Sequence, residues 1–116
     1  MQYLIVFLAT FTGWITALGL FILARGLSRG TFIAFHYLAD AILFGAIFFL
    51  YFKLSSQPLS SFAVMAAAMA SLFIFEFILW RFIAPGQAHL YLNFVDWVIP
   101  AFIIASTIYA IGKYLN

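Results

Sequence analysis

Three carboxylates are the residues of this sequence best suited to chemistry, and all three lie inside apolar segments. Asp40, Glu76 and Asp96 are the only acidic residues in the chain, and none lies in a polar stretch. A charged side chain at the centre of a membrane helix costs about 2.5–3.5 kcal/mol on insertion scales, so it is normally paired, turned inward or neutralised. A carboxyl group held in this way is suited to exchange a proton for a cation. The sequence therefore predicts an intramembrane carboxylate site.

Other polar residues accompany these acids at helical spacing. His36 and Asp40 are four residues apart, so they share one face of a helix. His89, Asn93 and Asp96 follow the spacing i, i+4, i+7, which forms one stripe if their helix starts early. The predicted substrate- or ion-binding residues are Asp40, Glu76, Asp96, His36 and Arg81, with His89 and Asn93 as further lining residues.

Several of these residues also have a purely structural interpretation. If the last helix begins at Asn93, that residue caps it and Asp96 satisfies free N–H groups in its first turn. Arg81 could snorkel to the headgroups, or pair with Glu76 or Asp96 as a structural staple. The two histidines could be interfacial polar residues. These alternatives stay open, but Asp40 and Glu76 lie too deep in their apolar segments to serve as helix caps.

The composition requires a membrane environment. Of the 116 residues, 68% are hydrophobic and only 7% are charged, and the mean hydropathy is +1.20. A water-soluble domain carries about 25% charged residues, so the lipid bilayer is the expected partner. The chain has no cysteine, which excludes disulfides, thiolate metal sites and cysteine nucleophiles. Its net charge of +2 comes from scattered basic residues, so nucleic acid is not an expected partner.

Four apolar segments match the thickness of a bilayer, which needs roughly 20 helical residues. The predicted helices cover about residues 3–24, 32–53, 61–84 and 91–114. Their connections are short, so consecutive helices should run antiparallel and lie side by side. The sequence predicts an all-α membrane protein, a four-transmembrane-helix antiparallel bundle that forms a single integral membrane domain over residues 1–116.

The ends of the predicted helices carry recognisable signals. Thr31 is placed to cap the second helix, and Ser60 or Ser61 is placed to cap the third. The second helix is expected to close at Lys53, and Pro85 is expected to stop the third.

An even number of spans puts both termini on one side of the membrane. We call this side A, together with the loop around Gln57, and the loops near Ser28 and Gln87 then lie on side B. The three acids fall at similar depths in the side-B half. Tryptophan and tyrosine residues near the two interfaces agree with this arrangement, and Trp14, at mid-depth, is expected to serve packing. Arginine is more frequent toward side B, which favours that side as cytoplasmic, although the bias is small enough to permit dual topology.

Small residues recur at the spacing that lets membrane helices approach closely. They are Gly13 and Ala17, Ala41 and Gly45, Ala63, Ala67 and Ala70, and Ala101 and Ala105. Packing within one bundle is the first interpretation, and a homo-oligomer, such as an antiparallel dimer, is the second.

The favoured function is a small cation- or proton-coupled transporter or channel. The first alternative is a hydrophobic accessory subunit of a larger membrane complex, stapled to partner membrane subunits by its buried charges. The third is a haem protein that uses His36 and His89, or a metal-binding protein whose ligands come from His36, Asp40, Glu76, His89 and Asp96. No phosphate loop, catalytic triad or nucleophile elbow is present, so an enzyme is not favoured and no cofactor is predicted.

Overall fold

The chain forms a bundle of four helices, as the sequence predicts. The computed structural model describes residues 2–24, 26–56, 58–83 and 97–115. The helices are α1 (Gln2–Leu23), α2 (Arg29–Leu54), α3 (Ser61–Ile78), a π-helical continuation η1 (Leu79–Ile83), and α4 (Ile99–Leu115). Residues 91–96, the predicted start of the last helix, lie outside the described residues.

Three of these helices have the length and composition of membrane spans. They are α1, α2 and the continuous helix Ser61–Ile83, whereas the described part of α4 is shorter, with 17 residues. Large apolar side chains cover the outside of the bundle, and Phe102, for example, is 73% exposed. Such a surface matches lipid rather than water. The chain therefore has the build of a membrane protein.

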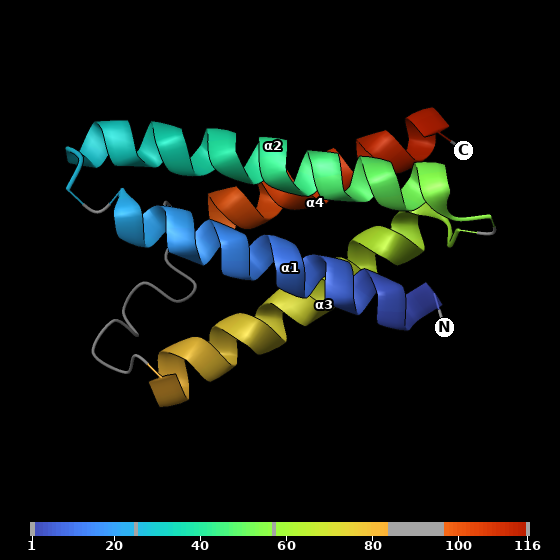
Figure 1. The fold of residues 1–116 in the computed structure, drawn as a ribbon, viewed down its shortest axis with the longest axis horizontal. Coiled ribbons are helices and arrows are strands. Elements are labelled where there is room, and N and C mark those ends of the chain that lie inside the picture. The colour runs from blue at the N-terminus through green and yellow to red at the C-terminus, as the bar shows by residue number, and fades with distance from the viewer. Residues whose placement is uncertain (1, 25, 57, 84–96, 116) are drawn as a thin grey trace.

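Both termini lie at one end of the bundle, together with the connection 55–60 (Figure 1). The connection 24–28 lies at the opposite end, which is side B, and consecutive helices run antiparallel. This confirms the predicted bundle with its termini on a common side.

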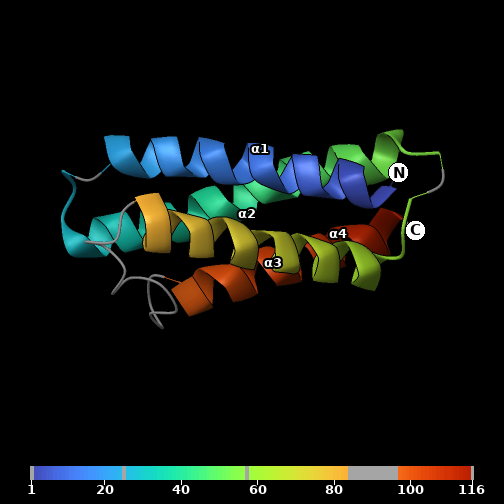
Figure 2. The ribbon, with the colours of Figure 1, turned by 90° about the horizontal axis from the view of Figure 1, so that it is seen from below.

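The helices are arranged differently around the bundle from the expected order. In the described part of the chain, α1 packs on α2 and α3, and α4 packs on the same two helices, so that α2 and α3 lie diagonally (Figure 2). The expectation that consecutive helices lie side by side is therefore correct for α1 with α2 and for α3 with α4, but wrong for α2 with α3. The six-residue connection 55–60 is long enough for this crossing, because each extended residue spans about 3.3–3.6 Å.

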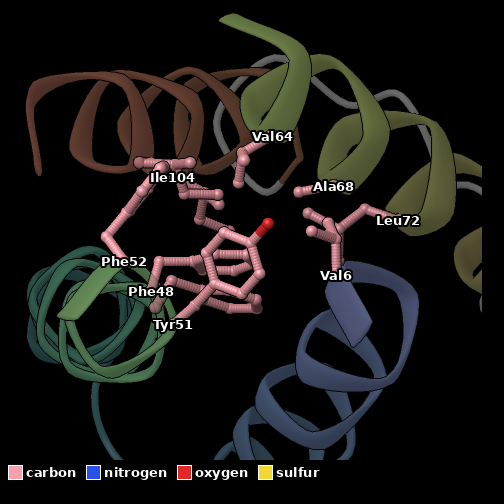
Figure 3. Packing of buried hydrophobic residues seen from close by; sticks show 10 residues of the cluster. Val6, Phe48, Tyr51, Phe52, Val64, Ala68, Leu72 and Ile104 are labelled. Carbon is pink, nitrogen blue, oxygen red and sulfur yellow. The ribbon is translucent and has the colours of Figure 1, made fainter. Parts of the chain in front are cut away.

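A dry core fills the side-A half of the bundle. Apolar side chains from all four helices meet there (Figure 3). Representative members are Val6, Phe48, Val64 and Ile108, all fully buried. This end is also tied by hydrogen bonds, since Tyr51 Oη donates to Gln2 Oε1 at 2.9 Å.

Two glycines allow close helix contacts. A Cβ on Gly13 of α1 would lie 2.8 Å from Cε1 of Phe44 in α2, and a Cβ on Gly112 of α4 would lie 2.5 Å from Cβ of Ser61 in α3. Gly45 faces the methyl group of Thr107 in α4. The small residues at Gly13 and Gly45 thus serve packing within the bundle.

The helix caps differ in part from those predicted. Ser28, not Thr31, caps α2, because its Oγ accepts from the Thr31 N–H at 3.4 Å. The prediction failed because α2 begins at Arg29, earlier than its apolar run, so that Thr31 lies inside the first turn. For α3 the cap is Ser60, one of the two serines expected, and its Oγ accepts from Ala63 N–H at 3.2 Å.

Candidate functional site

A pocket of about 170 Å³ occupies the side-B half of the bundle, and all four helices contribute to its wall. Among the described residues, three ionisable side chains line it, namely His36, Asp40 and Glu76. Six aromatic side chains form much of the remaining wall: Trp14, Phe21, Phe32, Phe44, Trp80 and Trp97. The pocket therefore combines acid groups with an aromatic lining.

Asp40 is held by the histidine one helical turn before it. His36 Nε2 lies 3.1 Å from Asp40 Oδ2, and both side chains are largely shielded from solvent. The His36 ring also packs against Phe21 of α1, with ring centroids 4.2 Å apart. The structure thus brings together the pair that the i, i+4 spacing placed on one face, and fixes its position against the neighbouring helix.

Glu76 is held by two indole groups from different helices. Trp14 Nε1 of α1 donates to Glu76 Oε1 at 3.2 Å, and Trp80 Nε1 of η1 donates to Glu76 Oε2. Each carboxyl oxygen therefore has one neutral donor. The π-helical turn that carries Trp80 starts three residues after the acid, and such turns are frequent at functional sites.

The two acids enter the pocket from diagonally placed helices. Asp40 belongs to α2 and Glu76 to α3, and both side chains line the same pocket. In the part of the chain that the structure describes, His36 is the only basic side chain paired with either acid. Two carboxyl groups therefore share, at most, one imidazolium among these residues.

Arg81 lies apart from these acids. Its side chain is exposed at the side-B end of η1, with its guanidinium over the Phe82 ring at 6.0 Å from the centroid. It does not belong to the described lining of the pocket. This position agrees with the snorkelling alternative, in which the charged group reaches toward the headgroups.

Three predicted site residues lie outside the described residues. They are Asp96, His89 and Asn93. The prediction that they line the approach to the acids stays a prediction, as do the capping role of Asn93 and the haem reading that pairs His36 with His89.

The tryptophans are the part of the site that the sequence reasoning missed. The sequence predicts a packing role for Trp14 and positions near the membrane interface for the other two tryptophans, Trp80 and Trp97. All three line the pocket. One signal was available, because Trp80 follows Glu76 by four residues and so shares its helix face. The contact of Trp14 depends on how α1 packs against α3, which no spacing in the sequence reveals.

The acids and the histidine do not form a dense set of metal ligands. Among the residues that the structure describes, no three His, Cys, Asp or Glu side chains are grouped so that they could hold a metal ion. His36 Nε2 already faces Asp40, so a haem iron would have to displace that contact. The described polar lining therefore consists of two carboxyl groups and one imidazole.

No known protein family, curated protein or solved structure is detectably similar to this chain.

Proposed function

We propose that this chain is a multi-pass membrane protein of four spans that binds a cation between Asp40 and Glu76 in exchange for a proton, as a small transporter or channel. One observation carries the proposal. Acids from two diagonally placed helices line a single pocket in the side-B half, and among the described residues His36 is the only basic side chain paired with either of them.

The hydrogen bonds around the acids support this function over a structural staple. One neutral indole donor bonds each oxygen of Glu76 without cancelling its negative charge. A buried charge is costly without compensation, and the described residues offer the two acids only one basic partner, so uptake of a proton or a cation would stabilise the pocket. A site that alternates between the two couples cation binding to proton release.

The packing supports access from side B. The pocket lies in the halves of the helices nearest the connection 24–28, and the dry core fills the opposite half. Passage through the molecule then requires this core to rearrange, as in a carrier with alternating access. We place side B in the cytoplasm, in line with the arginine bias.

Flux measurements on purified protein in liposomes test the proposal. An imposed cation gradient should drive proton movement, read by a trapped pH dye. Asp40→Asn and Glu76→Gln should each reduce it by roughly tenfold or more, because each removes one exchangeable proton from the site. Lys53→Gln is a matched control, since it changes one charge near side A, where the ammonium lies over Phe49, and it should leave the flux unchanged.

Folding has to be checked in the same samples. Both acid variants should keep the helical circular dichroism of the unmodified protein and unfold at a similar or higher temperature, because a strained acid relaxes when neutralised whereas a staple weakens. The proposal would be contradicted if the protein is well folded but none of the cations tested drives proton movement, or if the acid variants keep full flux. Either result would favour the accessory-subunit alternative.

A further inference from the structure

The wall of the pocket contains more aromatic surface than a site for a bare metal ion needs. Tryptophan and phenylalanine rings of α1, α2 and η1 line it, together with Trp97, which lies just before α4. Aromatic faces carry negative electrostatic potential and attract cations that lie within about 6 Å of the ring centroid. The wall can therefore contribute to cation binding together with the acids.

The hydrogen bonds at Glu76 fix the orientation of two of these rings. Because Trp14 and Trp80 both direct their N–H groups at the carboxylate, each indole ring is held in one position at the pocket wall. Phe21 and Phe32 are likewise fixed against His36, with centroid separations of 4.2 Å and 6.0 Å. The rings are thus positioned before any ligand enters, which lowers the entropic cost of binding.

Small inorganic cations find few oxygen ligands in this pocket. Calcium takes 6–8 oxygen ligands and magnesium requires an octahedron, whereas the described polar lining consists of two carboxyl groups and one imidazole. Three of the four carboxyl oxygens already have partners, in His36, Trp14 and Trp80. A cation that needs no complete oxygen shell fits these walls better.

The volume of the pocket indicates the size of its ligand. A dry protein cavity of about 150 Å³ accommodates a benzene molecule, and this pocket measures about 170 Å³. A group of a few carbon atoms around one charged nitrogen has comparable dimensions.

We infer that the ligand of this pocket is a small alkylammonium cation, with its alkyl groups against the aromatic wall and its charge opposite Asp40 and Glu76. This inference rests on the proposed function, because it names the class of cation that the same acids bind. Apolar contact with the rings replaces the hydration shell of the ligand, and the acids supply the charge that the rings lack.

Tryptophan fluorescence measures this binding directly, because all three tryptophans of the chain line the pocket. Purified protein in detergent is titrated with choline and with its neutral carbon isostere, 3,3-dimethylbutan-1-ol. Choline should change the emission saturably. The affinity for the alcohol should be lower by about tenfold or more, because the alcohol lacks the charge. Sodium and potassium chloride at equal ionic strength should give no saturable change.

Two phenylalanine variants separate the aromatic wall from general effects on folding. Phe32→Leu removes a ring from the wall and should weaken choline binding by roughly three- to tenfold, with little effect on the alcohol. Phe102→Leu is the matched control, because Phe102 is exposed on α4 and does not line the pocket, and it should bind choline like the unmodified protein. Thermal unfolding of both variants shows that they remain folded.

The possible failures are distinguishable. If sodium or potassium binds and drives proton movement while choline does neither, the alkylammonium inference is overturned and the proposed function stands. If the neutral alcohol binds as tightly as choline, the pocket selects apolar molecules and the inference is again overturned. If no cation of either kind binds or moves protons, both the inference and the proposed function fail.

Discussion

At the scale of single residues, Glu76 shows how a carboxylate can be held inside a bundle by neutral donors. One indole from α1 and one from η1 each donate to one of its oxygens. Hydrogen bonds to charged groups contribute about 1.5–3 kcal/mol, yet these two bonds add no positive charge to the site. Trp14 and Trp80 therefore orient the acid without neutralising its charge.

Gly13 positions another part of the pocket wall, the ring of Phe44. A Cβ at this position would lie 2.8 Å from the ring, so Gly13→Ala should lower the free energy of unfolding by about 1–3 kcal/mol through overpacking. Gly19→Ala in the same helix is the control, because no described atom from elsewhere in the bundle lies within 4 Å of a Cβ there, and it should raise stability by about 0.5–1 kcal/mol through helix propensity. Titration with a denaturing detergent measures both, and equal stability of the two variants would refute this packing.

At the scale of the helices, the N-terminal caps set where each element begins. The Ser28 hydroxyl accepts from the Thr31 N–H and also donates to Thr31 Oγ1 at 2.8 Å. Ser28→Ala should therefore reduce stability by about 1 kcal/mol, because it leaves the first turn of α2 without its acceptor. Thr31→Val keeps that acceptor and should cost less than about half as much. Thermal unfolding of the two variants compares them, and a larger loss in Thr31→Val would restore Thr31 as the cap.

The sequence reveals the elements because each apolar run is as long as a bilayer is thick, and a polar or glycine–proline cluster separates it from the next. It also reveals Asp40 and Glu76, because a charge inside an apolar run stands out. It does not reveal that α2 and α3 lie diagonally. A short connection makes two consecutive helices antiparallel, but it does not decide whether they pack against each other. The contact of Trp14 with Glu76 follows from that arrangement, which places α1 directly against α3.

At the scale of the whole molecule, the two halves of the bundle differ in construction. The side-A half holds the dry core, and Tyr51 ties that end together by donating to Gln2 and accepting from the Leu59 N–H at 3.2 Å. The side-B half holds the pocket with its acids. An apolar half beside a half that holds the acids places the candidate site nearer side B, which is the asymmetry that the proposed exchange requires.

Proton release on cation binding tests the central claim most directly. Purified protein in a weakly buffered solution with a pH indicator receives a saturating pulse of choline, and of sodium and potassium in parallel samples. We expect about one proton to be released per protein molecule by the cation that binds, because a cation and a proton compete for the same carboxyl groups. The double variant Asp40→Asn/Glu76→Gln should release none. No release from the folded unmodified protein with any of these cations, or equal release from the double variant, would contradict the account.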